Sequence, residues 1–425
     1  MFNLGRENTS LIAKWWRNID KQILLLFTIL FLLGLFFSFS STSSVVAEKM
    51  NKETYFFFIK HLIFVLISLF LIVAISIQDK NKLIKFLPYF FFISILLLSL
   101  VPVLGVEVKG SKRWMDLPLL PRFQPVELVK PLFIIYVAKI IVLNEKSNIY
   151  GRYLYSFLVL LLILIFLINQ PDLGQTLLLA STWITMIFVS GFNMFILTIL
   201  GLIFFGIIAL LILFFPEKFG YVLIRIKTFI DPKAGDNFQS QKALDAIKQG
   251  GLTGQGMGEG ILKDKVPEAH TDYIIAVISE EFGAIFIFFI IIIFLFIGYK
   301  VLNKVFSEQD EFVKLALVGL VSLLIIQTFI HIGVNTRLLP TTGMTLPFLS
   351  YGGTNTIINL LSMGRNRPKW DPQRQILRLN ELPTGMYSTG EVQGSAGFSG
   401  WSITSYSRSR TLSAGTTRTT EYGTL

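Results

Sequence analysis

The stretch 266–283 (VPEAHTDYIIAVISEEFG) carries carboxylates where a polar segment changes into a long apolar run. Asp272 comes directly before the run 273–299, which is long enough to cross a bilayer, so its carboxylate is expected at the water line. Glu280 and Glu281 lie about 12 Å deeper in the same run, at about 1.5 Å per residue. Ionisable groups at that depth are costly and usually face a cavity or a partner. This stretch is therefore the first candidate for a reacting carboxylate.

Two interpretations of Asp272 compete. Thr271 and Asp272 are of the types found at a helix cap and in a first turn, where an acidic residue contributes only about 0.3 to 1 kcal/mol. His270 would then be an ordinary surface histidine. In the second interpretation Asp272 accepts a proton in a reaction at the membrane surface. The carboxylates of Glu280 and Glu281 favour the second interpretation.

The composition excludes several classes of protein. Of the 425 residues 53% are hydrophobic and lie in long runs, which is typical of a polytopic membrane protein. The chain contains no cysteine and only three histidines, which excludes disulfides, thiolate metal sites, a cysteine nucleophile and a His-rich metal cluster. The net charge of +11 is spread over loops and the C-terminal tail, which favours anionic lipid over nucleic acid as the counter-charge.

Apolar runs of about 20 residues predict ten transmembrane helices and hence an all-α polytopic membrane protein. The expected cores are 23–39, 55–77, 83–104, 126–143, 153–168, 173–189, 195–215, 273–299, 312–333 and 349–364. A large outer loop, 216–271, separates the seventh helix from the eighth, and amphipathic helices are expected over 220–230 and 238–249. A membrane domain, 1–364, is thus followed by a Ser-, Thr-, Gly- and Arg-rich tail, 365–425, that is expected to be disordered.

The distribution of Lys and Arg predicts the orientation. Basic residues are concentrated at the N-terminus and in the loops after the second, fourth and eighth spans, which places both termini in the cytoplasm. The loop 106–124 disobeys this rule, because it carries Lys109, Lys112, Arg113 and Arg122 on the expected outer side. A phosphate or pyrophosphate group held by these cations would explain them. The alternative is that other charges set the topology and the loop is tolerated.

Three irregular outer segments are expected to surround the carboxylates. The glycine-rich segment 250–260 (GGLTGQGMGEG) follows no strand and lacks Gly-Lys-Ser, so it is neither a P-loop nor a dinucleotide fingerprint. Its glycines are expected to allow tight turns and close approach to a substrate or to the next helix. The other segments are 169–175 (NQPDLGQ) and 339–355 (LPTTGMTLPFLSYGGTN). Such backbone is tolerated near a membrane only where it is buried in protein or lines a wet cavity.

Six blocks, in order along the chain, resemble the SEDS family (shape, elongation, division and sporulation) of bacterial membrane proteins with ten transmembrane helices. The blocks are KGSKRW (109–114), QPVELVKP (124–131), NQPDLGQ, FQSQKALDAIKQGG running into GQGMGEG, VPEAHTDYIIAVISEEFG and LPTTGMTLPFLSYGG. PEAHTD and TLPFLSYGG look more like the division branch than the elongation branch. The chain departs from the family pattern at four places. Arg337 stands where a small residue is common, Thr342 stands where Lys is common, Thr354 and Asn355 replace a Ser pair, and the tail does not resemble the family.

The resemblance implies a peptidoglycan glycosyltransferase that polymerises lipid II in septal cell-wall synthesis and cell division. In that reaction a sugar 4-hydroxyl attacks the anomeric carbon of the lipid-linked donor, and undecaprenyl pyrophosphate leaves. The chemistry needs a base for the hydroxyl proton and cations for the pyrophosphate. Asp272 occupies the position of the family's essential aspartate, and Lys112 and Arg113 are the candidates for the phosphate contacts.

Further substrate-binding candidates come from the same blocks. They are Glu127, Lys130, Gln170, Asp172, His270, Glu280, Glu281, Ser350, Gly352 and Gly353. The structural alternative for Glu127 and Lys130 is a buried ion pair. For Glu280 and Glu281 an orienting or proton-sharing role is favoured, and packing against a polar neighbour is the alternative.

The resemblance also implies a location and partners. These are the bacterial cytoplasmic (inner) membrane at the division septum, a class B penicillin-binding protein that supplies the transpeptidase step, and other division proteins. No certain cofactor is implied, and a role for a divalent cation (Mg²⁺ or Mn²⁺) at the pyrophosphate is left open. A lipid II flippase, which would also suit broken helices, and an elongation-type polymerase are the alternatives. Charges that cluster at one outer water line favour an enzyme over a transporter.

Overall fold

The computed structural model describes residues 15–16, 19–41, 56–78, 80–108, 111–116, 122–143, 148–214, 216–231, 238–269 and 271–350. Its helices are α2 (Lys21–Ser41), α4 (Phe56–Ile77), α5 (Lys80–Leu104), α6 (Pro125–Leu143), α7 (Ile149–Asn169), α8 (Leu173–Val189), α9 (Met194–Phe214), α10 (Pro216–Ile230), α11 (Phe238–Gly250), the short η1 (Lys263–Lys265), α12 (Ile274–Ser307) and α13 (Glu311–Asn335). Two strands, β1 (Val106–Val108) and β2 (Ser111–Trp114), lie between α5 and α6. His270, Gly352, Gly353 and the predicted tail 365–425 lie outside the described residues.

Helices occupy nine of the ten predicted spans, namely α2, α4 to α9, α12 and α13. Within the described ranges five of them, α2, α5, α7, α12 and α13, are long and apolar enough to cross a membrane, and α4, α8 and α9 contain shorter apolar stretches. The chain is therefore a mostly helical, multi-pass membrane protein. The tenth predicted span, 349–364, begins where the described residues end, so the number ten stays a prediction.

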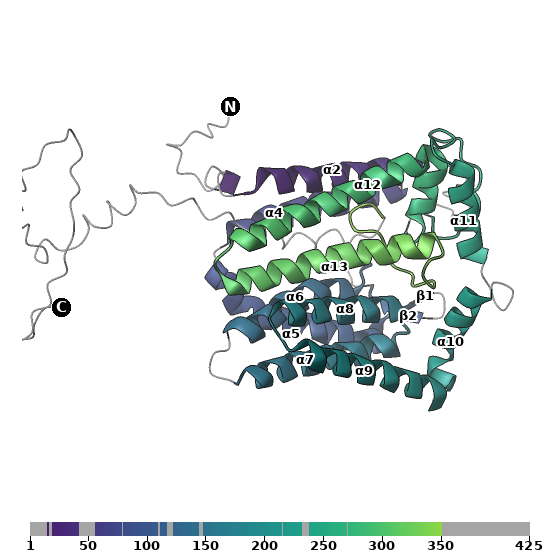
Figure 1. Cartoon of the computed structure of the whole chain (residues 1–425). Helices are drawn as coiled ribbons and strands as arrows, with labels where there is room; N and C mark the ends of the chain where they lie inside the picture. Colours follow the sequence, from purple (N-terminus) through teal and green to yellow (C-terminus); the bar gives the residue numbers. More distant parts are fainter. Residues whose placement is uncertain are drawn as a thin grey trace, which may run out of the picture. The chain divides into compact units, whose positions relative to one another are not determined.

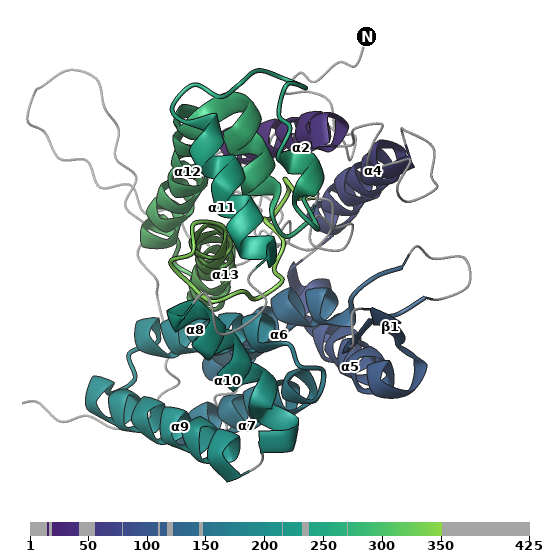
Figure 2. The same ribbon diagram turned by 90° about the vertical axis from the view of Figure 1, so that its right-hand side faces the viewer.

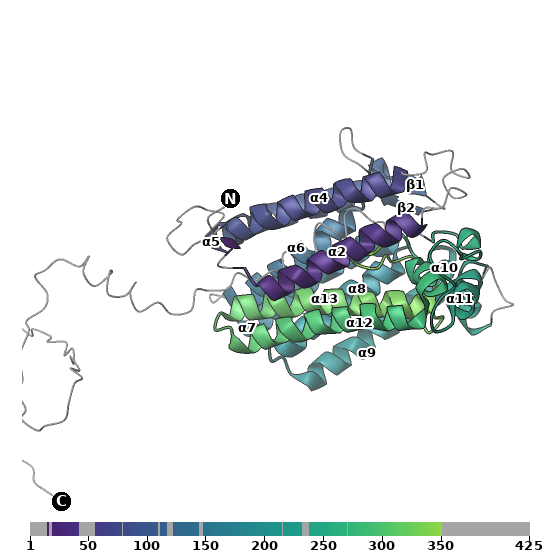
Figure 3. The same ribbon diagram turned by 90° about the horizontal axis from the view of Figure 1, so that it is seen from above.

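Helix α13 lies between two packed groups of helices. It contacts α6 and α8 on one side and α12 on the other (Figure 1). One apolar core joins α13 to α5, α6, α7 and α8, and a second joins it to α2, α4 and α12. The end-on view shows α13 between these groups (Figure 2), and the view from above shows α2 and α4 beside α12 and α13 (Figure 3). Residues on α13 can therefore fix elements from both groups.

The short elements gather at one end of the bundle (Figure 1). Helices α10 and α11 match the amphipathic helices predicted over 220–230 and 238–249. Strands β1 and β2 pair antiparallel, with Glu107 opposite Lys112, in a region that the sequence indicated only as a loop. Strands of three and four residues give too few alternations for a period-2 pattern to stand out.

The glycine-rich segment packs directly on α12, where the helix is kinked at Gly283 (φ 81°, ψ 175°). The N–H of Gly256 donates to the carbonyl oxygen of Glu281 at 3.0 Å. A Cβ on Gly254 would lie 2.2 Å from that same oxygen, and a Cβ on Gly283 would lie 2.2 Å from the Leu252 carbonyl oxygen. The prediction that the glycines permit close approach to the next helix is therefore confirmed.

The segment that follows α13 returns into the protein. Phe348 is fully buried, and its ring packs against Phe27 and Phe31 of α2 at centroid distances of 5.0 and 5.3 Å. A Cβ on Gly34 of α2 would lie 2.2 Å from the Phe348 carbonyl oxygen. This irregular backbone is thus buried in protein, as predicted for its depth.

Candidate functional site

Asp272 is fixed through backbone groups at the start of α12. The Nδ2 of Asn335 donates to the Asp272 carbonyl oxygen at 3.0 Å, and the Oγ of Ser350 donates to the Thr271 carbonyl oxygen at 2.7 Å. The N-cap of α12 is Tyr273, whose side chain makes no capping hydrogen bond. Asp272 therefore precedes the cap, and its predicted placement in the first turn is wrong by a residue or two. The anchors hold its backbone and do not use its carboxylate.

The segment 339–350 brings a glycine beside this carboxylate. On α13 the Nε2 of Gln327 donates to the Thr345 carbonyl oxygen at 3.0 Å, and the Nδ1 of His331 lies 2.7 Å from the Met344 carbonyl oxygen. These two contacts fix the backbone next to Gly343, whose φ of 67° lies in the left-handed region that favours glycine.

Asp272 and Arg113 border the same space beside Gly343. A Cβ on Gly343 would lie 3.4 Å from the Asp272 Oδ2 and 3.9 Å from the Arg113 Nη1. A carboxylate and a guanidinium from elements far apart in the sequence therefore meet beside a backbone position without a side chain. A substrate group in that space would meet a proton acceptor and a cation together.

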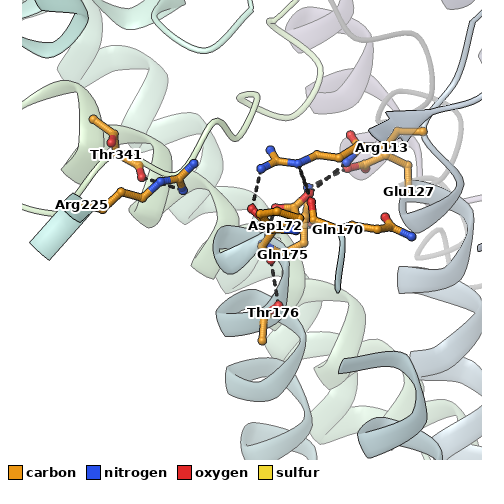
Figure 4. A network of polar contacts seen from close by, with 10 residues as sticks. Arg113, Glu127, Gln170, Asp172, Gln175, Thr176, Arg225 and Thr341 are labelled. Carbon is orange, nitrogen blue, oxygen red and sulfur yellow. Dashed lines mark hydrogen bonds and ion pairs between the residues drawn. The ribbon is translucent and has the colours of Figure 1, made fainter. Parts of the chain in front are cut away.

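Arg113 reaches from β2 to the turn between α7 and α8 (Figure 4). Its Nε donates to the Gln170 carbonyl oxygen at 3.1 Å, its Nη2 donates to the Pro171 carbonyl oxygen, and its Nε lies 3.9 Å from the Asp172 Oδ2. Asp172 also caps α8, accepting from the Gln175 N–H at 3.3 Å. Burial raises the pKa of Asp172, and the Arg113 guanidinium opposes that rise. The turn thus holds Arg113 in a fixed direction.

The side chains of Lys112 and Arg113 point to opposite faces of β2, although both were predicted to contact phosphate. Successive side chains of a strand point to opposite faces, so two adjacent residues of β2 cannot both face the site. Lys112 is exposed, whereas the Arg113 side chain is only 15% exposed and contacts the 170–172 turn. Of the two, Arg113 is the one that lies beside Asp272.

Arg225 is a cation of this region that the sequence analysis did not single out. It lies on α10, and its Nη1 donates to the Thr341 carbonyl oxygen at 3.1 Å (Figure 4), two residues before Gly343. Burial lowers the pKa of Arg225, the nearby Arg113 guanidinium lowers it further, and Asp172 opposes both. The amphipathic pattern over 220–230 predicted the helix but not which basic residue points inward.

Glu127 and Lys130 form a buried ion pair on α6. They are 4% and 2% exposed, and the Lys130 Nζ lies 2.8 Å from the Glu127 Oε2. The Gln175 Nε2 donates to Glu127 at 3.0 Å, and Lys130 donates to the Gln327 Oε1 at 3.2 Å. The pair therefore joins α6, α8 and α13, which is the arrangement of the structural alternative.

Glu280 and Glu281 belong to another network, between α12 and the outer loop. Glu280 accepts from the N–H groups of Leu262 (2.8 Å) and Lys263 (2.6 Å). Glu281 accepts from the Lys263 ammonium and from the Ser40 hydroxyl. Both carboxylates are fully buried, so the arrangement favours packing against polar neighbours over contact with substrate. Lys263 is the partner that the sequence did not indicate.

Among the parts of the chain that the structure describes, no three or more His, Asp or Glu side chains are grouped to hold a metal ion. The Arg113 guanidinium lies beside both Asp172 and Gly343. A role for Mg²⁺ or Mn²⁺ stays a prediction.

Comparison with known proteins agrees with this architecture. The family model of cell cycle proteins named for FtsW, RodA and SpoVE matches residues 20–365. The probable peptidoglycan glycosyltransferase FtsW of Caulobacter vibrioides is 32% identical over 361 residues, covering 85% of this chain and 91% of that protein. The corresponding FtsW of Haemophilus influenzae is 34% identical over 355 residues, covering 81% and 88%.

Two solved structures share the fold. One is the rod shape determining protein RodA of Thermus thermophilus, with a TM-score of 0.60 and 23% identity over 82% of this chain and 96% of that chain. The other is a chain from a peptidoglycan synthase complex that coordinates polymerization and crosslinking. Its TM-score is 0.63 and its identity 22%, over 81% of this chain and 95% of that chain.

Proposed function

Because the chain belongs to the FtsW, RodA and SpoVE family of cell cycle proteins, we propose that it is a peptidoglycan glycosyltransferase that polymerises lipid II. Its relatives at 30% identity or more over most of their length are named probable peptidoglycan glycosyltransferases. The geometry supports this proposal most directly at Gly343, where the Asp272 carboxylate and the Arg113 guanidinium border one space.

The proposed reaction assigns one role to each group. Asp272 accepts the proton of the acceptor 4-hydroxyl as the hydroxyl oxygen bonds to the anomeric carbon of the donor. The bond from that carbon to the pyrophosphate breaks, and the leaving group takes the electron pair. Arg113, held by the 170–172 turn, stabilises the charge that develops on the pyrophosphate. Because its guanidinium is already oriented, this stabilisation costs little reorganisation during the reaction.

The distribution of charge favours the enzyme over a flippase. In the part of the chain that the structure describes, the buried Asp, Glu and Lys side chains are Glu127, Lys130, Asp172, Lys263, Glu280 and Glu281. They lie in the first three turns of α6 or α12, at the N-cap of α8 or in the outer loop, at the end of the bundle that carries α10 and α11 (Figure 1). A path for a charged headgroup through the bilayer would need ionisable groups along the length of the helices.

The orientation and the location are part of the proposal. The basic loops support an orientation with both termini in the cytoplasm and the site on the outer face of the bacterial cytoplasmic membrane. The proposed role in division corresponds to a location at the septum. An impermeant thiol probe should label a cysteine at Lys227 from outside and one at Asn81 only from inside. Labelling of both positions from the same side would contradict this orientation.

Lipid II polymerisation by the purified chain tests the function. We expect labelled glycan strands, with more product when a class B penicillin-binding protein is present, because a chain of this fold occurs in a peptidoglycan synthase complex. Parallel reactions with Mg²⁺, with Mn²⁺ and with chelator test the role of a divalent cation. Transport of lipid II across vesicles without any glycan product would replace this proposal with the flippase.

Arg113→Ala should weaken lipid II binding by about tenfold or more, because a charge-assisted contact is typically worth about 1.5 to 3 kcal/mol. Lys112→Ala removes an equal charge from the opposite face of β2 and should change binding less than about twofold. Equilibrium binding of labelled lipid II to both variants measures the difference. Equal losses in the two variants would mean that the loop acts by its net charge.

A further inference from the structure

A pocket lies next to the site among α10, α11 and the segment after α13. Its polar lining consists of Arg225, Thr228, Ser240, Arg337 and Thr341, and it is partly open to solvent. Its lining contains two arginines and three hydroxyl-bearing residues but no acidic residue. A recess of this composition favours an anion. The mechanism above leaves it without a ligand.

Arg337 occupies a position where helices usually carry glycine. Helix α13 ends at Asn335, Thr336 is its C-cap, and Arg337 follows with φ 58°. The Leu338 N–H donates to the Gly333 carbonyl oxygen at 2.7 Å, as in helix ends that close with a left-handed residue. A side chain is strained in that conformation, and strained residues cluster at functional sites. The chain therefore keeps a guanidinium where glycine would fit with less strain.

Both guanidiniums keep N–H donors available. The Arg225 Nη1 donates to the Thr341 carbonyl oxygen at 3.1 Å, and the Arg337 Nη1 donates to the Gln241 Oε1 at 2.7 Å. Each arginine has five N–H donors in a planar fork that matches a carboxylate. Among the described residues neither guanidinium has a carboxylate within ion-pair distance. The two contacts orient the guanidiniums without neutralising them.

We propose that this pocket binds a carboxylate of the peptide carried by the lipid-linked substrate. The proposal rests on the proposed function, since a peptidoglycan precursor carries a peptide besides its sugars and its pyrophosphate. Arg113 beside Gly343 takes the pyrophosphate, and Thr341 connects that space to the pocket two residues away. The pocket is therefore placed to hold a second anion of the same molecule, remote from the reacting bonds, and so to fix its orientation.

Equilibrium binding of two forms of lipid II tests this proposal independently of turnover. One form has free peptide carboxylates and the other has them amidated. We expect amidation to raise the Kd about tenfold for the wild-type chain. Arg337→Gly should raise the Kd of the free form by a similar factor and should bind both forms equally. Glycine suits the left-handed position, so this variant should keep its fold, and its thermal stability checks that.

Lys227→Gln is the matched control, because Lys227 is exposed on α10 and does not line the pocket. It should keep the tenfold preference. Equal binding of both forms by the wild type, or a preference that survives Arg337→Gly, would overturn the proposal. A Kd that follows the anionic lipid content of the vesicles instead of amidation would also overturn it and assign the pocket to a lipid phosphate. Failure of the proposed function would differ from all of these, since both forms would bind but no glycan would form.

Discussion

Asp272→Asn is expected to lower glycan polymerisation by about 10² to 10⁴, the usual contribution of a general base. The amide keeps the size of the side chain but cannot accept the hydroxyl proton. Stability should change by about 1 kcal/mol or less, because Asn335 and Ser350 hold backbone carbonyl groups at this point and α12 begins after Asp272. Activity and stability therefore separate in this variant.

The measurement is glycan formation from labelled lipid II, beside lipid II binding and thermal unfolding of the same preparation. Glu259→Gln, which neutralises an exposed carboxylate in the glycine-rich segment, is the control and should stay close to wild type. If Asp272→Asn retains more than about a third of the activity, Asp272 is not the base at this magnitude. A joint loss of activity and stability would not distinguish a base from a structural residue, and Glu281→Gln is then the next variant.

Lys130→Met is expected to have the largest effect on stability, lowering the free energy of unfolding by about 3 to 5 kcal/mol. The substitution leaves the Glu127 carboxylate buried without its cation and removes a donor from Gln327. The double variant Glu127→Gln, Lys130→Met has no uncompensated charge and should recover most of the loss. The pair therefore matters for stability as a unit.

Lys314→Met provides the matched control on α13. Lys314 pairs with Glu311 at the same i, i+3 spacing and 2.8 Å, but its side chain is 30% exposed and that of Glu311 68%. Its loss should cost less than about 1 kcal/mol in thermal or denaturant unfolding. If Lys130→Met proved equally mild while lipid II binding fell, the pair would be reassigned from structure to substrate binding.

The helices could be predicted because apolar runs report burial in lipid or protein directly. Nine of the predicted spans coincide with α2, α4 to α9, α12 and α13, and the amphipathic patterns also placed α10 and α11. The β1–β2 pair could not be predicted, since three- and four-residue strands carry too little pattern. This omission affected the predicted site, because the geometry of β2 directs Arg113 toward the site and Lys112 away from it.

The partners within the site could not be predicted, because they come from pairings between distant elements. The segments containing Asp272 and Arg113 were identified, but the meeting of these two side chains beside Gly343 depends on the return of 339–350 along α13. Glu280 and Glu281 resembled site residues, because a sequence shows how deep a residue lies in the membrane but not which neighbour its side chain faces. Lys263, which lies in a polar loop, gave no sign that it is their buried counter-charge.

The close approach of Gly34 to Phe348 joins an early part of the chain to a late part, so this contact forms only near the end of synthesis. The two residues are about 300 positions apart. At a synthesis rate of about 5 to 20 residues per second, Phe348 is therefore added roughly 15 to 60 seconds after Gly34 of α2. Asp272 likewise emerges before Asn335 and Ser350, which anchor its turn. We therefore expect a chain that stops before Ser350 to be inactive, even though it contains both Asp272 and Arg113.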